Sequence, residues 1–370
     1  MKIGCPKEIK DNENRIGLTP SAAHAYVEAG HQVFVEKGGG LGSAIADDEY
    51  TAVGATILPT AADVWKTADM IVKVKEPLES EYPLMRENQL LYTYFHFAAD
   101  EKLLKACLQR KIVALAYETV QEGHALPLLK PMSEVAGRMS TLMGAFYLAK
   151  SQGGRGLLPM GVTGVAPAEI LVLGGGVVGT NAAHVAGGLK ANVSVLDVSL
   201  PRLEYLSEIM PPNVYCLYND PVTLESKLKT ADIVIGAVLV PGAKAPKLVR
   251  REHLKLMKQG AVLVDVAIDQ GGCFETSHPT THSDPIFTVD GVIHYCVANM
   301  PGAYARTSTY ALNNATIKYG LALANLGPEK ACRDSEPLRH GLNAYKGAIT
   351  YKAVAEAFGL EYKPAESVIG

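Results

Sequence analysis

Short apolar runs rich in β-branched residues alternate with longer amphipathic stretches along most of the chain, and these runs predict strands. Strands are predicted at residues 32–36, 70–74, 90–95, 112–116, 170–173, 192–196, 232–237, 261–266 and 292–296. Several runs are apolar at every position, as in Ile170-Leu-Val-Leu. That pattern is typical of parallel strands covered by helices on both faces, so it predicts a doubly wound α/β protein.

Three helices carry clear start or stop signals. The first is predicted to begin after Thr19, whose hydroxyl can cap it, with Pro20 in its first turn and Gly30 at its end. A longer helix is predicted to begin at Ser133, and its apolar residues recur at spacings of four and three. They are Val135, Met139, Leu142, Phe146 and Ala149. A third long helix is predicted from near Thr307.

Composition and charge exclude several classes of protein. The formal net charge is −3 and no run of lysines occurs, which argues against nucleic acid and anionic membrane partners. The N-terminus has no apolar stretch typical of a signal peptide, and none of the six cysteines forms a C-x-x-C pair. Residues 170–189 lack charge, but six of them are glycine, which argues against a membrane helix. A cytoplasmic protein with reduced thiols is expected.

A glycine-rich turn follows the strand at residues 170–173. Gly174 permits a tight turn, Gly176 lets a pyrophosphate approach the backbone, and Gly179 lets helix and strand pack closely. Val177 and Val178 open the helix, whose free N–H groups and positive dipole end favour phosphates. Such a turn by itself is weak evidence, since glycine-rich turns are common.

The strand at 192–196 strengthens this interpretation because it ends in Asp197, 23 residues after Gly174. A carboxylate there can accept both ribose hydroxyls of NAD and would repel the 2′-phosphate of NADP. NAD is therefore the predicted cofactor, and a tight turn with a chance aspartate is the alternative. Arg202 either lies against the adenosine or is a solvated helix charge.

The position of the turn in the middle of the chain indicates two domains. At 370 residues the chain exceeds the usual size of one core, and the residues before the turn have their own βα pattern. We expect a discontinuous catalytic domain, residues 1–128 plus 304–370, and an NAD-binding domain, residues 129–303. Two Rossmann-like domains with a cleft between them, joined by long helices, are predicted.

Basic residues in the first domain are candidates for substrate binding. Arg15 precedes the Thr19 cap, and a guanidinium can hold a substrate carboxylate through two hydrogen bonds, although a surface arginine is the commoner reading. Lys73 and Lys75 fall on one face of a strand, so that face must meet solvent, a carboxylate or a ligand. Lys75 lies at the strand's carboxyl end, where open α/β sheets bind ligands.

Three further segments carry candidates for chemistry. His96 ends an aromatic strand and is either a general acid/base or a buried core histidine. Asp269 lies just beyond a strand end, which favours it over Asp265. Asn299 and Met300 follow the last predicted strand and can meet the nicotinamide. We predict no metal site, because the spacing at Cys273, His278 and His282 lacks a paired cysteine.

Longer motifs extend over essentially the whole chain. They include Arg15-Ile-Gly-Leu-Thr-Pro, Lys73-Val-Lys-Glu-Pro, Tyr117-Glu-Thr-Val-Gln, Pro131-Met-Ser-Glu-Val-Ala-Gly-Arg, Gly236-Ala-Val-Leu-Val-Pro-Gly-Ala-Lys-Ala-Pro, Val264-Asp-Val-Ala-Ile-Asp-Gln-Gly-Gly and Val297-Ala-Asn-Met-Pro-Gly. Together they resemble the alanine dehydrogenase family. The resemblance implies a homo-hexamer of two-domain subunits that deaminates L-alanine reversibly to pyruvate and ammonia, with NAD accepting a hydride.

The resemblance also implies roles for single residues. Arg15 and Lys75 would bind the substrate, His96 would be the acid/base, and Asp269 would orient water, ammonia or the imine. Several residues would contact the cofactor. They are Ser133 at the phosphates, Asp197 at the adenine ribose, Asn219 (or Asp220) at the adenine, Asn299 and Met300 at the nicotinamide, and Arg202, Val238, Leu239, Ile268, Asp269 and Val297 along the same surface.

Three alternatives to an alanine dehydrogenase stay open from the sequence. One is the NAD-binding subunit of a nicotinamide nucleotide transhydrogenase, which shares this fold. Another is a dehydrogenase or cyclodeaminase that acts on a different amino acid. The third is an NAD-sensing module with a decayed site, against which the joint presence of Arg15, Lys75, His96 and Asp269 argues.

Overall fold

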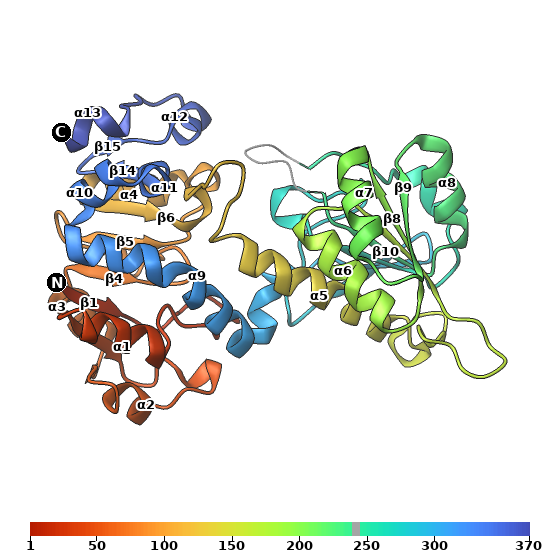
Figure 1. The fold of residues 1–370 in the computed structure, drawn as a ribbon, viewed down its shortest axis with the longest axis horizontal. Helices are drawn as coiled ribbons and strands as arrows, with labels where there is room; N and C mark the ends of the chain where they lie inside the picture. Colours follow the sequence, from red (N-terminus) through yellow and green to blue (C-terminus); the bar gives the residue numbers. More distant parts are fainter. Residues whose placement is uncertain (239–244) are drawn as a thin grey trace. The chain divides into compact units, whose positions relative to one another are not determined.

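The computed structural model describes residues 1–238 and 245–370, and the chain divides into two compact units. Unit 1 contains residues 1–132 and 302–370, and unit 2 contains residues 133–301 (Figure 1). Each unit is built around one sheet made mainly of parallel strands. The predicted α/β class with two Rossmann-like sheets is confirmed.

The sheet of unit 1 runs in the order β15-β14-β6-β5-β4-β1-β2-β3. Its strands are β1 (Lys2–Cys5), β2 (Gln32–Glu36), β3 (Thr56–Leu58), β4 (Met70–Val72), β5 (Leu90–Thr93), β6 (Val113–Ala116), β14 (Leu342–Tyr345) and β15 (Ala348–Ile349). The first six pair in parallel, whereas β14 is antiparallel to β6. Chain direction along the sheet reverses between β1 and β4, and such switch points are where open α/β sheets bind ligands.

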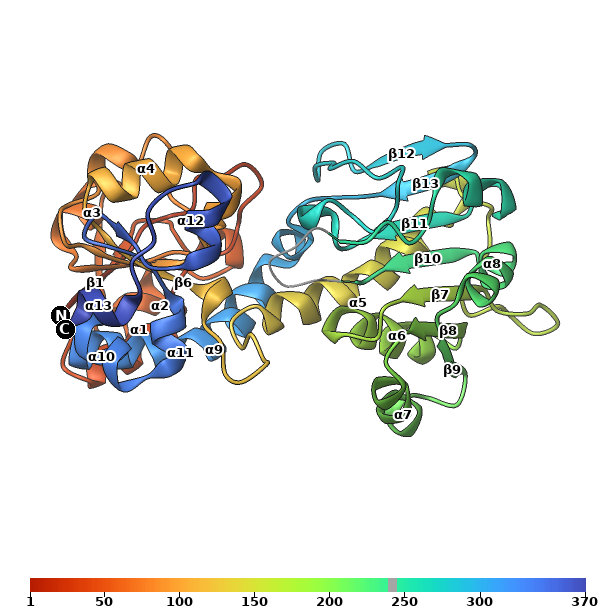
Figure 2. The same ribbon diagram turned by 90° about the horizontal axis from the view of Figure 1, so that it is seen from above.

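Helices cover both faces of this sheet (Figure 2). They are α1 (Pro20–Glu28), α2 (Asp47–Thr51), α3 (Ala61–Thr67), α4 (Glu101–Gln109), α9 (Ala305–Leu326), α10 (Pro328–Asp334), α11 (Glu336–Gly341), α12 (Lys352–Phe358) and α13 (Ala365–Ile369). On one face Trp65 of α3, Leu103 of α4 and Val354 of α12 share a buried cluster with strand residues. A Cβ at Gly320 of α9 would lie 2.0 Å from the Tyr26 hydroxyl. The lack of a side chain at Gly320 therefore lets α9 pack closely against Tyr26.

The sheet of unit 2 runs in the order β12-β13-β11-β10-β7-β8-β9. Its strands are β7 (Glu169–Leu173), β8 (Asn192–Asp197), β9 (Val214–Tyr218), β10 (Ile233–Gly236), β11 (Val262–Asp265), β12 (Ile286–Val289) and β13 (Val292–Tyr295). All pairs are parallel except β12 with β13. Direction reverses between β7 and β10, so this sheet repeats the strand order of the sheet in unit 1.

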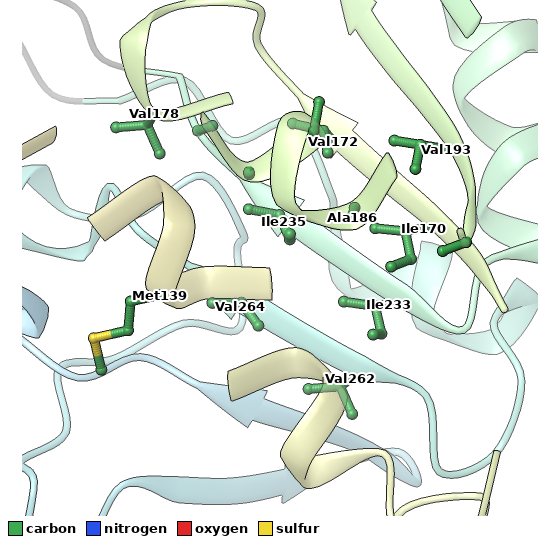
Figure 3. Packing of buried hydrophobic residues seen from close by; sticks show 14 of the residues in the cluster. Met139, Ile170, Val172, Val178, Ala186, Val193, Ile233, Ile235, Val262 and Val264 are labelled. Atoms are coloured by element: carbon green, nitrogen blue, oxygen red, sulfur yellow. The ribbon is translucent and has the colours of Figure 1, made fainter. Parts of the chain in front are cut away.

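Alternate strand residues of unit 2 build two separate cores. Ile170 and Val172 belong to the cluster that also holds residues of α5 (Lys130–Tyr147) and α6 (Val177–Gly188), shown in Figure 3. Leu171 and Leu173 belong to the cluster beneath α8 (Pro221–Thr230). Each such side chain stabilises the fold by about 1.5–3 kcal/mol when fully buried. The strands are apolar on both faces because both faces are covered.

The prediction for α5 was wrong in its start and in part of its buried face, although Met139 is buried as expected. The helix begins at Lys130, and Leu142 and Phe146 are 41% and 52% exposed. Small residues also face the core: a Cβ at Gly137 would lie 2.3 Å from the Val178 carbonyl oxygen, and one at Gly144 would lie 2.7 Å from Ile233. At these two positions α5 lies so close to α6 and the sheet that only glycine fits. A pattern of large apolar residues does not reveal such positions.

Other elements match the predictions more closely. Thr19 caps α1 by accepting a hydrogen bond from the Ala22 amide at 3.2 Å, and α9 begins at Ala305. The predicted strands are all present, some of them shorter by one or two residues. The strands β9 and β14 were not predicted. Most residues of β9 are at least partly exposed, and β14 has only four residues, one of which is the polar Asn343. The uncharged run at residues 170–189 forms β7, the turn and α6. Within the described residues, no helix is long and apolar enough to cross a bilayer.

His294 is a buried polar residue on β13. Its Nδ1 lies 3.0 Å from the Val292 carbonyl oxygen, so Nδ1 carries the proton, and Nε2 accepts from the Thr276 hydroxyl at 2.7 Å. The ring also stacks on Phe287 with centroids 4.9 Å apart. Burial is the main reason that the pKa of His294 falls to about 4, so the side chain is neutral in the folded protein at neutral pH.

We expect His294 to make stability depend on pH. An unfolded histidine takes up a proton near pH 6.5, whereas folded His294 does so only near pH 4. The free energy of unfolding should therefore drop by about 3 kcal/mol as the pH falls through that window. Chemical denaturation between pH 7 and 4 measures it. His294→Gln should flatten this dependence and His184→Gln, on the exposed side of α6, should not; equal slopes in both variants would exclude the role.

Candidate active site

Polar residues of unit 1 gather at the carboxyl ends of four neighbouring strands. Glu8 follows β1, Lys75 follows β4, His96 follows β5 and Glu118 follows β6. Parallel pairing aligns these strand ends at one edge of the sheet. The edge also contains the β1/β4 switch point, where a doubly wound sheet binds its ligand.

Arg15 is buried rather than at the surface, which corrects the commoner reading of the sequence. Its Nε donates to Glu13 Oε1 at 2.7 Å and its Nη2 donates to Glu13 Oε2 at 2.6 Å. Its Nη1 lies 3.0 Å from the sulfur of Met132. Burial by itself lowers the pKa of Arg15, but the Glu13 carboxylate more than offsets this and raises it. The guanidinium is thus charged, and its two hydrogen bonds to Glu13 fix its orientation.

Of the two strand lysines, Lys73 has a structural role. Its ammonium lies 3.1 Å from Glu8 and 3.0 Å from Glu81, and all three side chains are buried. Burial lowers the pKa of Lys73, but the two carboxylates together raise it. The expectation that this face meets a carboxylate is met at Lys73. Lys75 is half-buried, and its amide donates to Glu8 Oε1 at 3.2 Å.

His96 is exposed, which removes the reading of it as a buried core histidine. Its backbone is left-handed, with φ at 52° and ψ at 38°. Its ring stacks on Tyr94, with centroids 5.8 Å apart and planes 9° apart. An exposed imidazole at a strand end can reach a bound substrate, and an imidazole is suited to general acid/base work.

The glycine turn of unit 2 has the geometry expected of a dinucleotide site. Gly174 has φ at 98°, which favours glycine, and a Cβ at Gly179 would lie 1.8 Å from the Gly174 carbonyl oxygen. At Gly176, the N-cap of α6, a Cβ would meet nothing within 4 Å. Gly176 is exposed and leaves space at the helix N-terminus, where a pyrophosphate binds. Val177 is exposed beside it, while Val178 packs into the core.

Asp197 and Arg202 both hold this turn. Asp197 ends β8, and its Oδ2 accepts from the Gly175 amide at 2.7 Å. Arg202 donates from Nε to the Gly175 carbonyl at 2.6 Å and from Nη2 to the Thr180 hydroxyl at 2.7 Å. Arg202 is therefore not simply a solvated helix charge, since it ties α7 (Leu200–Ile209) to the turn.

The end of β9 distinguishes Asn219 from Asp220 as the adenine-side candidate. The Asp220 carboxylate caps α8, accepting from the Val222 and Thr223 amides at 2.9 Å each. Hydrogen bonds from Thr223 lower its pKa. The Asn219 amide donates to the Asp197 carbonyl at 2.9 Å, which places Asn219 beside the ribose candidate. Asn219 is the better candidate because its side chain does not cap the helix.

The carboxyl ends of β10 and β11 carry further candidates. Val238 lies next to the turn, since a Cβ at Gly174 would be 2.8 Å from its Cγ2; Leu239 lies outside the described residues. Asp265 is buried and accepts from the Cys273 and Phe274 amides at 3.1 and 3.2 Å. Asp269 is exposed on the turn Ile268–Gln270, so the preference for Asp269 over Asp265 agrees with the burial of the two carboxylates.

The remaining cofactor candidates of unit 2 lie after β13 and in α5. Val297 and Met300 are buried, and Asn299 between them has a left-handed backbone with φ at 63°. Nε2 of His282 lies 3.3 Å from the Asn299 carbonyl oxygen. Ser133 is half-buried in the first turns of α5. The turn after β13 is thus fixed in a conformation that asparagine tolerates.

Three carboxylates at the site were missed by the sequence reading. Glu8, Glu13 and Glu118 each accept hydrogen bonds from site residues or from the backbone beside them. Glu13 stands two residues before Arg15 and could have been found as its partner. Glu118 belongs to a quoted motif, but its contact partners are more than twenty residues away in the chain. Sequence alone gave no sign of that contact.

The two sheets and the turn define a dinucleotide-binding protein of the Rossmann type, with an acid/base candidate in its other unit. Sequence comparison assigns residues 4–136 to the family domain described as "Alanine dehydrogenase/PNT, N-terminal domain" and residues 140–352 to the matching C-terminal domain. The chain therefore belongs to the alanine dehydrogenase/PNT family, and the resemblance inferred from its motifs is confirmed.

Individual relatives agree with this assignment. The chain is 54% identical, over the full length of both, to a protein of Methanococcus maripaludis named alanine dehydrogenase. A solved L-alanine dehydrogenase superposes with a TM-score of 0.95 and 48% identity, covering 97% of this chain and 99% of that one. A solved transhydrogenase from Sinorhizobium meliloti gives a TM-score of 0.82 and 26% identity, covering 95% and 100%.

Two glycine substitutions should separate folding of the turn from cofactor binding. Gly176→Ala points its methyl group into open space, so the protein should fold normally and bind NADH at least about tenfold more weakly. Gly179→Ala should instead destabilise unit 2, because its Cβ overlaps the Gly174 carbonyl. Thermal unfolding and NADH fluorescence titration measure the two effects.

Gly188→Ala is the matched control for these variants. Gly188 ends α6, and a Cβ there also meets nothing within 4 Å. It should leave NADH affinity unchanged. Wild-type NADH affinity in Gly176→Ala would show that the pyrophosphate does not approach the turn.

Proposed function

We propose that this chain is an NAD-dependent L-alanine dehydrogenase. It converts L-alanine, NAD⁺ and water reversibly to pyruvate, ammonium, NADH and a proton. The observation that carries the proposal is full-length similarity to proteins of that name together with a complete set of polar candidates. Those candidates are Arg15, Lys75 and His96 in unit 1 and Asp269 in unit 2.

Unit 1 binds the substrate in this proposal. Glu13 binds the Nε–Nη2 side of the Arg15 guanidinium, and in this proposal the guanidinium also binds the substrate carboxylate. Lys75 stabilises negative charge on the substrate oxygen. Lys73 forms ion pairs with Glu8 and Glu81. The buried Glu13 keeps the guanidinium in place before the substrate arrives, which lowers the cost of ordering it on binding.

His96 and Asp269 carry the proton and charge changes. When bound, NAD supplies the acceptor for the hydride that leaves the substrate Cα. Asp269 stabilises the positive charge of the resulting substrate iminium. The substrate ammonium loses one proton before the hydride leaves, which is the proton released overall. His96 takes a proton from water as the water adds to the iminium carbon, and returns it to the amine. The C–N bond then breaks as the C=O bond forms, and the hydroxyl proton goes to the departing ammonia, which leaves as ammonium. Pyruvate is then released.

The cofactor is NAD rather than NADP in this proposal. The Asp197 carboxylate ends β8 beside the glycine turn, and it accepts from the amides of Gly175 and Ser199. A fixed negative charge there would accept ribose hydroxyls and repel a 2′-phosphate. Arg202 does not offset this preference, because its guanidinium is directed to Gly175 and Thr180.

The likeness to a transhydrogenase structure supports the second candidate, an NAD-binding transhydrogenase subunit. The identity to that structure is 26%, against 48% to the L-alanine dehydrogenase structure. A subunit that only binds nucleotide has no need of a substrate-binding arginine or an exposed acid/base histidine. The dehydrogenase is therefore the better supported candidate.

We further propose a homo-hexamer that works in the cytoplasm. Unit 2 exposes a set of large apolar side chains, and such surfaces often become covered by other subunits. They are Leu142, Phe146, Leu158, Val162 and Val165. All six cysteines are free thiols, which suits a reducing compartment.

A substrate panel tests the proposed activity. Purified protein should reduce NAD with L-alanine at alkaline pH, where proton release favours deamination, and should not do so with L-lysine. Absorbance of NADH at saturating NAD measures the rate. Faster turnover of another amino acid would replace alanine as the substrate. NADH binding without any turnover would favour the transhydrogenase subunit.

Replacing Asp197 tests the cofactor assignment. Asp197→Ala removes both the ribose acceptor and the charge that would repel a 2′-phosphate, so kcat/KM for NAD should fall and that for NADP should rise relative to it. The ratio of the two values is the measurement. Asp220→Ala is the matched control, since that carboxylate caps α8, and it should keep the wild-type ratio. An unchanged ratio in Asp197→Ala would remove the role.

A further inference from the structure

The backbone at His96 is held in a conformation that costs free energy. Its φ of 52° and ψ of 38° lie in the left-handed region, which non-glycine residues adopt at a cost on the order of 1–3 kcal/mol. His96 begins the turn Phe97–Ala99, three residues after the strand that ends at Thr93. It also determines where the exposed imidazole points. Contacts around the turn must therefore stabilise it.

Glu118 supplies such contacts from the neighbouring strand. It follows β6, which pairs in parallel with β5 so that Thr93 lies opposite Ala116. Its Oε1 accepts from the His96 amide at 2.6 Å, and each of its two oxygens lies 3.2 Å from the Phe95 amide. These two amides flank Phe95, so the carboxylate fixes the backbone of Phe95 and the amide at which the left-handed residue His96 begins. Hydrogen bonds to a charged group contribute about 1.5–3 kcal/mol each.

The ring of His96 has its own support from aromatic residues. It stacks on Tyr94, whose hydroxyl donates to the Leu128 carbonyl at 2.5 Å. Tyr94 in turn meets the Tyr117 ring edge-on, with centroids 5.0 Å apart. Tyr117 immediately precedes Glu118, so one short segment after β6 supports both the backbone and the ring of His96.

The same arrangement occurs at two other strand ends. Glu8 follows β1 and accepts from the Val74 and Lys75 amides after the neighbouring β4, at 2.6 and 3.2 Å. Asp197 ends β8 and accepts from the Gly175 amide after the neighbouring β7. In each case a carboxylate at one strand end holds the backbone of a site segment that follows the adjacent strand.

We propose that Glu118 is a positioning residue for His96. Its carboxylate holds the left-handed backbone of His96, so that the imidazole stays stacked on Tyr94 and presented for proton transfer. The inference deepens the proposed function, since it rests on His96 as the acid/base. It requires an acceptor oxygen at position 118 and does not require the negative charge to act on the substrate.

Three variants at position 118 test the proposal. Glu118→Ala removes the acceptor and should lower kcat for alanine deamination by about 10- to 100-fold, because misplacing an acid/base by about 1 Å has effects of that size. KM for NAD should stay within about twofold of wild type, since the cofactor candidates belong to unit 2. Glu118→Gln keeps one acceptor oxygen and should restore kcat to within about threefold of wild type. Glu118→Asp is one methylene shorter and should behave like the alanine variant.

Glu122→Ala is the matched control. Glu122 lies four residues further along and bonds Lys318 and Tyr319 rather than the His96 turn, so its loss should leave kcat unchanged. Wild-type kcat in Glu118→Ala would overturn the proposal. So would a glutamine variant as slow as the alanine variant, because the charge and not the acceptor would then matter. If Glu118→Ala does not fold, the contrast between the glutamine and aspartate variants decides in the same way.

Hydrogen exchange separates failure of this inference from failure of the proposed function. A peptide that covers residues 94–97 should exchange faster in Glu118→Ala than in wild type and Glu118→Gln, because its two amides lose their acceptor. That result does not depend on which substrate the enzyme uses. If wild type does not turn over alanine, the proposed function fails while exchange still tests the contact. Unchanged exchange in Glu118→Ala would overturn the contact itself.

Discussion

Parallel strand pairing is the constraint on which the rest of this structure depends. Because neighbouring strands run in the same direction, their carboxyl ends meet along one edge of each sheet. In unit 1 that edge brings Lys75, His96 and Glu118 onto adjacent strands, although they are far apart in the chain. In unit 2 it brings the glycine turn, Asp197 and Asp269 to one edge in the same way. Each unit thus obtains a site from the carboxyl ends of neighbouring strands.

Carboxylates at these edges order the loops that carry the chemistry. Loops that follow strand ends leave backbone amides without ladder partners, and buried amides need acceptors. Three carboxylates accept hydrogen bonds from amides that follow the neighbouring strand: Glu8, Glu118 and Asp197. Asp265 accepts from amides in the segment that follows its own strand, β11. The price is burial of charge, which is costly when unpaired. Lys73 offsets part of this cost at Glu8, where burial raises the pKa of the carboxyl by more than Lys73 lowers it.

The two units divide the proposed reaction between them. Unit 1 contains the proposed substrate and proton-transfer residues, and one of them, Arg15, is held by a buried ion pair with Glu13. Unit 2 contains the turn, whose close contact between Gly179 and Gly174 leaves room at Gly176. The two domain models of the alanine dehydrogenase/PNT family together match residues 4–136 and 140–352, so the family match includes residues of both units. In the proposed positioning role, Glu118 connects the end of β6 to the backbone of the exposed His96.

The sequence by itself determined the features whose causes are local. The Thr19 cap, the apolar strands, the glycine turn and the aspartate that ends the next strand all depend on residues close together in the chain. Their residue types are required by backbone geometry, so the pattern identifies them. Family motifs then identified the candidate residues, because long runs of matching residues are unlikely to arise by chance.

Tertiary structure alone decided the features that depend on distant partners. It buried Arg15, committed Lys73 to Glu8 and Glu81, and directed Arg202 to the turn. It also turned Gly137 and Gly144 of α5 toward the core, because α5 lies too close to α6 and the sheet for a side chain at those positions. It also placed Glu118 against the His96 backbone. Burial and side-chain contacts depend on which strands become neighbours in the sheet. The residue pattern within a single strand does not determine which strands pair with it.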